Sequence, residues 1–213
     1  MKIIGLSGAA GSGKDTVCGF ALEWCEENGL KAERLAFADP LKVSAAACFG
    51  YPPSKALEFC NWLKQPGVFV TAERQEGDGD LPLEVAEAHG IKGKRVSGRQ
   101  FLQFFGTEGH RDVFGSEFWV EVTERKLAER AGTDLDVVFL TDPRFPNESA
   151  MIHKHDGEIW EVVRPQQSTA EEHASEAGLP EGAIEFQIHN VSSLDALRVL
   201  VRSVCEHNLE EVA

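Results

Sequence analysis

The sequence predicts an α/β protein of three layers, in which helices cover both faces of a parallel five-stranded sheet. Three observations lead to this fold class. Apolar stretches with the character of strands alternate along the chain with stretches of helical periodicity. The apolar stretch 136–142 is continuous, as is typical of a strand buried on both faces of a parallel sheet. A glycine-rich turn joins the first strand directly to the first helix.

The first part of the chain alternates strand and helix twice. Residues 1–7 are interpreted as a strand, and the following helix ends at Asn28-Gly29. The apolar side chains that recur at helical spacing in it are Val17, Phe20, Ala21 and Trp24. A second strand is predicted over 32–37 and a second helix over 40–48, with proline in its first turn. Residues 50–95 are interpreted as an insertion with a mobile loop, in which helices are predicted around 54–63 and 82–89.

The second part of the chain continues the alternation. A helix is predicted from Ser97 to Thr107, where glycines bend or end it, and another over 116–131. The remaining predicted elements are strand 136–142, helix 147–155, strand 158–163, strand 184–191 and helix 194–205. The apolar face of the last helix is assigned to Leu194, Leu197, Leu200 and Val201. A polar stretch, 164–182, separates the last two strands.

Composition limits the classes of protein to consider. With 213 residues the chain fits one domain, and 35 acidic against 21 basic residues give a net charge of −14. Such a charge disfavours a general nucleic-acid binder, which needs a basic face. The five cysteines show no Cys-x-x-Cys spacing, so no zinc site or redox pair is predicted. Neither a signal peptide nor an apolar run of membrane-spanning length is evident, so we expect a cytoplasmic protein with no membrane partner.

The glycine-rich loop, residues 8–16, reads GAAGSGKDT and stands between the first strand and the first helix. In this context glycines let backbone N–H groups approach an anion, and the helix start adds further donors. Lys14 then supplies charge to the β- and γ-phosphates of a nucleotide. Asp15 occupies the position where Ser or Thr usually binds Mg²⁺, and Thr16 follows it. The loop therefore predicts ATP binding, while the usual magnesium ligand is left open.

Polar residues follow the predicted strands at the edge where ligands bind in parallel α/β sheets. Asp39, Asp142 and Arg164 each come just after a predicted strand. An acidic residue that closes an apolar strand beside a phosphate-binding loop is typical of a magnesium site. Asp142 is therefore a candidate for holding Mg²⁺, in part through water, together with Asp15 and Thr16.

Several stretches in chain order together resemble the deoxynucleoside monophosphate kinases of tailed bacteriophages. These stretches are GSGKDT (11–16), FADPLK (37–42), RQFLQ (99–103), GTE (106–108), TDPRFPNE (141–148) and HASE (173–176), with Arg111 and Trp119. The resemblance extends from about residue 3 to residue 205 and is loosest over 50–95. Pro143 departs from it, because a small aliphatic residue is expected there. The resemblance implies a single P-loop kinase domain that transfers a phosphoryl group from ATP to a deoxynucleoside monophosphate.

The resemblance also implies roles for individual residues. The catalytic set is Lys14, Arg99, Arg111, Asp142 and Arg144. The ATP-binding set is Ala10, Gly11, Ser12, Gly13, Lys14, Asp15, Thr16 and Arg164. The acceptor-binding set is Asp39, Lys42, Arg99, Gln103, Thr107, Arg111, Trp119, Asp142, Arg144, Glu148 and Glu176. Arginines suit this chemistry because their forked donors match phosphate groups, and an indole face can stack on a base. Residues 50–95 would belong to the acceptor-binding region, and residues 164–182 would form a lid hinged at Arg164.

Each of these assignments has an alternative. Arg99 could pair with a carboxylate, Trp119 could pack in the core, and Asp39 could cap the helix that follows it. His173 and Glu176 could belong to a solvated loop. Two other functions are also open: a small-molecule kinase resembling dephospho-coenzyme A kinase, and a nucleotide-dependent switch that transfers no phosphate. The sequence leaves a homodimer open as well.

Overall fold

The computed structural model describes residues 1–71, 95–165 and 178–212. The predicted helix 82–89, His173, Glu176 and most of the predicted lid lie outside these residues. The chain divides into two compact units, of which unit 1 is Met1–Pro40 with Arg111–Ala213, and unit 2 is Leu41–His110. The predicted insertion 50–95 falls within unit 2.

Unit 1 is built on a sheet of five parallel strands, which confirms the predicted fold class. In chain order these strands are β1 (Lys2–Ser7), β2 (Ala32–Leu35), β5 (Val137–Leu140), β6 (Glu158–Val163) and β7 (Phe186–His189). Their order across the sheet is β2-β5-β1-β6-β7. All four residues of β5 are buried, because this strand lies inside the sheet with helices on both faces. This position explains its continuous apolar sequence.

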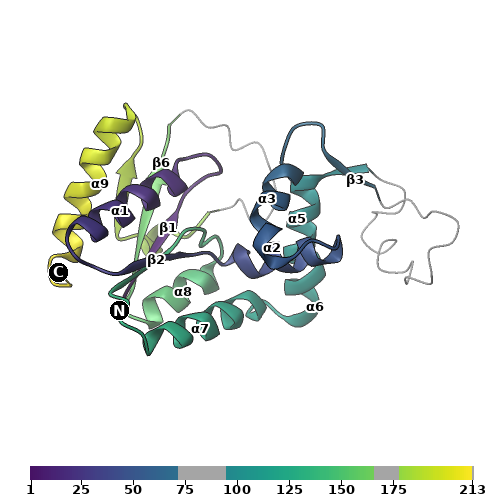
Figure 1. The fold of residues 1–213 in the computed structure, drawn as a ribbon, viewed down its shortest axis with the longest axis horizontal. Coiled ribbons are helices and arrows are strands. Elements are labelled where there is room, and N and C mark those ends of the chain that lie inside the picture. The colour runs from purple at the N-terminus through teal and green to yellow at the C-terminus, as the bar shows by residue number, and fades with distance from the viewer. Residues whose placement is uncertain (72–94, 166–177, 213) are drawn as a thin grey trace, which may run out of the picture. The chain divides into compact units, whose positions relative to one another are not determined.

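Helices cover both faces of this sheet and make a separate core on each (Figure 1). One face carries α1 (Lys14–Glu27) and α9 (Leu194–Leu209), and the other carries α7 (Phe118–Ala131) and α8 (Pro146–Lys154). The first core contains Trp24, Trp160 and Val201. The second contains Val120 and Ile152. Helices cover both faces of the sheet, so the edge formed by the carboxyl ends of the strands is lined by the loops that follow them.

Two predictions about helices are wrong in detail. In α9, Leu194 and Leu200 are 66% and 37% exposed, and the buried stripe is formed instead by Leu197, Val201, Val204, Cys205 and Leu209. The helix continues four residues beyond the predicted end, and its full length brings these later positions onto α1. Helix α2 (Ala38–Cys48) begins two residues earlier than predicted. Asp39 therefore lies inside its first turn and does not precede it.

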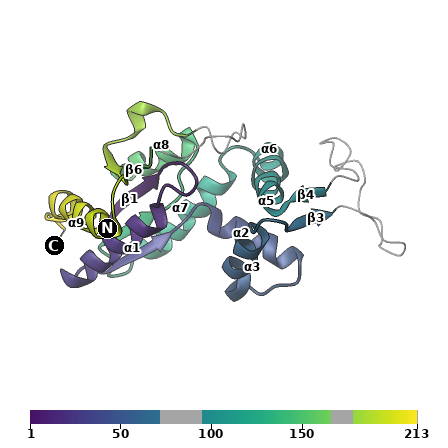
Figure 2. The same ribbon diagram turned by 90° about the horizontal axis from the view of Figure 1, so that it is seen from above.

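Unit 2 has a small core of its own and a two-stranded sheet. Strands β3 (Phe69–Thr71) and β4 (Arg95–Ser97) pair antiparallel (Figure 2). The sequence did not predict them, since three residues are too few to show an alternating pattern. A short 3₁₀ turn, Pro53–Lys55, leads into α3 (Ala56–Leu63), which confirms the helix predicted there. The buried side chains of this core are Ala45, Ala46, Ala56, Phe59, Cys60, Leu63 and Leu102.

Helix α5 (Gly98–Gly106) begins after Ser97, as predicted. The Ser97 hydroxyl accepts from the backbone N–H of Gln100, and the Gln100 side chain accepts from the backbone N–H of Ser97. These reciprocal bonds satisfy two donors that a helix start otherwise leaves unpaired. A π-helical turn, Thr107–Arg111, and a short helix, α6 (Asp112–Phe114), follow at the predicted bend. Among the described residues, no helix is both long enough and apolar enough to cross a membrane.

Candidate active site

The glycine-rich loop connects β1 to α1, and the backbone conformation of one of its glycines strongly favours glycine. Gly13 has φ +106°, which side-chain-bearing residues rarely adopt. A Cβ atom there would also stand 2.6 Å from Nδ2 of Asn190. Asn190 follows β7 and donates from Nδ2 to the carbonyl oxygen of Ser12, with a distance of 2.8 Å. The loop is thus held from outside by a residue that the sequence did not single out.

Lys14 is the first residue of α1, and its side chain folds back over the glycine-rich loop. Its Nζ donates to the carbonyl oxygens of Gly8 at 2.7 Å and Ala9 at 2.8 Å. These bonds keep the ammonium group beside the backbone of the loop. The amide N–H groups at the start of α1 add positive potential at the same place. The loop therefore offers an anion a cation and several N–H donors together.

A cation from β2 lies between two of the predicted acidic residues. Arg34 Nε is 4.0 Å from Asp15 Oδ1, and Arg34 Nη1 is 3.5 Å from Asp39 Oδ2. The side chain of Asp15 is 89% exposed, whereas Arg34 is 32% exposed. The sequence did not predict a role for Arg34. The signal was a basic residue within the predicted strand 32–37, five positions before Asp39.

Asp142 joins the ends of two neighbouring strands. Its Oδ1 accepts from the backbone N–H of Phe37 at 2.7 Å, and its Oδ2 accepts from that of Ala38 at 3.1 Å. Because β2 and β5 are parallel neighbours, both ends meet at the carboxyl edge of the sheet, as the sequence predicts. Asp142 also satisfies free N–H groups at the start of α2. Each carboxylate oxygen retains a lone pair beyond these bonds.

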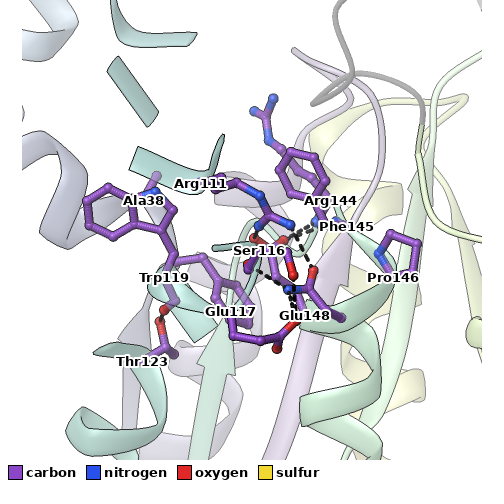
Figure 3. Close-up of polar contacts among 12 residues, drawn as sticks. Ala38, Arg111, Ser116, Glu117, Trp119, Thr123, Arg144, Phe145, Pro146 and Glu148 are labelled. Atoms are coloured by element: carbon purple, nitrogen blue, oxygen red, sulfur yellow. Dashed lines mark hydrogen bonds and ion pairs between the residues drawn. The ribbon is translucent and has the colours of Figure 1, made fainter. Parts of the chain in front are cut away.

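Arg111 is the centre of a second group of side chains, which we call the Arg111 cluster: Arg111, Phe145, Asn147 and Glu148. Figure 3 labels Arg111, Phe145 and Glu148 of this cluster. The guanidinium carbon of Arg111 lies 3.7 Å from the centroid of the Phe145 ring. Nη1 is 3.4 Å from Glu148 Oε1, and Nη2 donates to Asn147 Oδ1 at 3.1 Å. Only 9% of Arg111 is exposed. The cluster follows β5 and therefore stands at the carboxyl edge of the sheet.

Glu148 is buried at the base of this cluster. Its Oε2 accepts from the backbone N–H groups of Arg144 at 2.7 Å and Phe145 at 3.1 Å. Burial raises the pKa of Glu148 to about 7, and the nearby Asp142 carboxylate adds to the rise. The backbone bonds and Arg111 oppose this rise without cancelling it. Glu148 was predicted to bind the acceptor, and in this structure its described bonds go to protein groups.

Trp119 lies in the first turn of α7 and is 5% exposed. Its ring meets that of Phe118 edge to face, with 4.7 Å between the centroids. Its carbonyl oxygen accepts from the hydroxyl of Thr123 at 2.9 Å (Figure 3). So little exposed area favours the packing alternative for Trp119 over an open stacking face.

Four predicted site residues belong to unit 2. Lys42 lies on α2, Arg99 and Gln103 lie on α5, and Thr107 opens the π-helical turn. All four side chains are half-buried. α5 ends at Gly106, so Thr107 lies in the π-helical turn and not in the α-helix that carries Arg99 and Gln103. Arg164, which belongs to unit 1, is exposed directly after β6.

Comparison with known proteins shows which proteins the chain is similar to. A family model described as deoxynucleotide monophosphate kinase matches residues 83–201. A deoxynucleoside-5'-monophosphate kinase of Escherichia phage T5 is 26% identical over 98% of this chain and 97% of its own length. A deoxynucleotide monophosphate kinase of Enterobacteria phage T4 is 24% identical over 92% of this chain and 95% of its own length. A dephospho-CoA kinase from Campylobacter jejuni aligns over 100% of this chain and 97% of its own, with 15% identity and a TM-score of 0.39.

Proposed function

The chain belongs to the deoxynucleotide monophosphate kinase family, whose model matches more than half of its residues, and on that premise we propose that it transfers the γ-phosphoryl group of ATP to a deoxynucleoside monophosphate. The observation that carries this proposal lies within unit 1. The glycine-rich loop with Lys14 and the Arg111 cluster stand at the same edge of one parallel sheet. Two sets of phosphate-binding groups at one edge suit a reaction between two phosphorylated substrates.

The donor side is assigned to the glycine-rich loop. Backbone N–H groups of the loop and of the start of α1 bind the phosphates of ATP, and Lys14 exchanges its bonds to Gly8 and Ala9 for bonds to phosphate oxygens. Charge builds on the transferred group as it moves. Lys14 stabilises that charge, and because it is held beside the loop beforehand, little reorganisation is needed.

The acceptor side is assigned to the arginines. Arg111 uses two of its five N–H donors for Glu148 and Asn147, and the others are proposed to bind the acceptor phosphate. Arg144 is proposed to add charge around the same phosphate. The resemblance to the family implies that Arg99 and Lys42, on unit 2, also bind the acceptor. Asp39, Gln103 and Thr107 are proposed to bind the sugar or base. No general base is required, because a phosphate oxygen of the acceptor is already a nucleophile.

Magnesium is implied by the family, and the residues present fit it. Mg²⁺ prefers oxygen ligands and takes most of them from water and substrate phosphates. Asp15 is highly exposed beside Lys14, Thr16 follows it, and the Asp142 oxygens retain lone pairs. The described residues contain no group of three or more His, Cys, Asp or Glu side chains that could hold a metal by themselves. When bound, the ion would neutralise phosphate charge, with these three residues as its protein ligands, directly or through water.

The decisive experiment measures nucleotide consumption against a panel of acceptors. With ATP, we expect turnover with one or more of dTMP, dGMP, dCMP and dAMP, and formation of the diphosphate by chromatography. Their ribose forms test sugar discrimination, and dephospho-coenzyme A tests the rival kinase. Turnover with dephospho-coenzyme A alone, or hydrolysis that no acceptor accelerates, would contradict the proposal.

The assignment of arginines to the acceptor is tested by substitution. Arg99→Ala and Arg111→Ala should each lower kcat/KM for the acceptor by roughly 10- to 100-fold, because a charge-assisted bond to phosphate is lost. The KM for ATP should stay within about twofold in the same assays. Arg125→Ala is the matched control, since this arginine is 74% exposed and pairs only loosely with Glu121 on the surface of α7. A selective loss of ATP affinity would place the arginine on the donor side.

A further inference from the structure

The Arg111 guanidinium is held by three contacts of unequal character. The Phe145 ring, at 3.7 Å, fixes the plane of the guanidinium but lets it slide and rotate within that plane. The contact with Glu148, at 3.4 Å, is long for a hydrogen bond. The bond to Asn147, at 3.1 Å, is the shorter of the two polar contacts. With only the Phe145 ring and the long contact to Glu148, the guanidinium could rotate within its own plane. The shorter bond to Asn147 prevents that rotation.

Asn147 is itself fixed by bonds that determine which way its amide faces. Nδ2 donates to the carbonyl oxygen of Ser116 at 2.8 Å and to Oε1 of Glu117 at 3.0 Å. With both N–H donors used there, Oδ1 must face the Arg111 guanidinium. Turning the amide over would place N–H against N–H and oxygen against oxygen. The amide therefore has one satisfied orientation, and it is the one that binds Arg111.

Asn147 also connects elements that are distant in sequence. It stands in the first turn of α8, it bonds to Ser116 and Glu117 just before α7, and it bonds to Arg111 at the end of the π-helical turn. Ser116 and Glu117 are tied together as well, because the Ser116 hydroxyl donates to Glu117 Oε1 at 3.0 Å. In the described part of the structure, Glu148, whose carboxylate also belongs to the Arg111 cluster, does not link α8, the start of α7 and the π-helical turn in this way.

We propose that Asn147 is a positioning residue, which holds the Arg111 guanidinium in the orientation that presents its remaining N–H donors to the acceptor phosphate. This inference rests on the proposed function, in which Arg111 binds that phosphate. Small displacements of a group that binds the reacting phosphate are costly in rate. Asn147 would therefore affect turnover of the acceptor although it touches no substrate.

The test compares Asn147→Ala and Asn147→Ser with Asn208→Ala. Asn208 is the matched control, because its Nδ2 donates to a single carbonyl oxygen, that of Val204, within α9. We expect both Asn147 variants to lower kcat/KM for the acceptor roughly tenfold, with the KM for ATP unchanged within about twofold. The serine variant keeps a polar side chain in the first turn of α8, and thermal unfolding of each variant shows that it is folded. Kinetics equal to those of Asn208→Ala would overturn the proposal.

A double-mutant cycle separates positioning from a general structural role. In an Arg111→Met background, Asn147→Ser should cause no further loss of kcat/KM beyond about twofold, because its effect passes through Arg111. The same tenfold loss in both backgrounds would overturn the proposal.

A third measurement does not depend on activity. Exchange of the Arg111 Nε–H proton, followed by NMR and assigned with Arg111→Lys, should be faster in Asn147→Ser than in the unaltered protein. An unchanged exchange rate would contradict the positioning role, whether or not the protein phosphorylates a deoxynucleotide. Faster exchange in the variant, together with an unaltered protein that is inactive, would contradict the proposed function alone.

Discussion

The glycine-rich loop and the Arg111 cluster stand at one edge of the same sheet but are built in opposite ways. The loop is made from consecutive residues, and its binding groups are mostly backbone N–H groups. The Arg111 cluster is made from side chains 36 positions apart in the sequence, stacked and bonded in a buried place. The loop can be recognised from nine consecutive residues of the sequence, 8–16. The cluster exists only once two distant segments have come together, so its function depends more heavily on the tertiary structure.

The largest effect on turnover is expected when the positive charge of Lys14 is removed from the glycine-rich loop. Lys14→Ala should lower kcat roughly 10²- to 10³-fold, because charge that develops during transfer loses its stabilising cation. The fold should persist, since the lysine side chain donates to carbonyl oxygens of the loop and stands outside the apolar cores of the sheet. Steady-state kinetics and thermal unfolding check both statements, with the exposed Lys31→Ala as control. Near-normal turnover in Lys14→Ala would show that the loop does not serve transfer.

A second prediction concerns stability and the buried carboxyl group of the Arg111 cluster. The pKa of Glu148 is about 7 in the folded protein against an ordinary value of 4.5, so the folded state binds this proton more tightly. The stability that the protonated carboxyl contributes is therefore complete below about pH 4.5 and is lost as the pH rises through 7. A shift of this size corresponds to roughly 3 kcal/mol.

Glu148→Gln removes this titration. The unfolding free energy of the unaltered protein should fall relative to that of the variant between pH 4.5 and pH 8, by up to roughly 3 kcal/mol. Denaturant unfolding at several pH values measures the difference. Glu121→Gln, on the exposed surface of α7, is the control substitution. A flat difference for Glu148→Gln would mean that the pKa of Glu148 in the folded protein equals its ordinary value, so that the backbone bonds and Arg111 fully offset the effect of burial.

The smallest expected effect is on ATP binding, when the side chain of Asn190, which bonds to the glycine-rich loop from the end of β7, is removed. Asn190→Ala removes the 2.8 Å bond to the Ser12 carbonyl oxygen. The loss should weaken ATP binding by about 1 kcal/mol, because the loop keeps its sequence and most of its backbone bonds. Calorimetric titration with ATP measures this, and Asn208→Ala serves again as control. An effect as large as that of Lys14→Ala would mean that the loop, like the Arg111 cluster, depends on a distant side chain.

The same contrast explains how much the sequence could predict. The parallel sheet, the glycine-rich loop and the meeting of strand ends at Asp142 follow from local patterns, and the structure confirms the sheet and that meeting. Arg111 was identified only by resemblance. Its partners were not predicted, because nothing local to Asn147 reveals that an arginine 36 residues earlier lies against it. Arg34 was missed for the same reason: its two acidic partners come from different helices.

The order of strands has a consequence for how the chain becomes folded during synthesis. β1 pairs with β5 and β6, and β2 pairs with β5, so neither amino-terminal strand has a neighbour in the sheet until residue 140 has been made. Unit 2, by contrast, is one uninterrupted stretch of sequence with its own core. We therefore expect unit 2 to fold first as it leaves the ribosome, while the apolar strands β1 and β2 are still unpaired. Until β5 emerges, those two strands are the part of the nascent chain most exposed to wrong association.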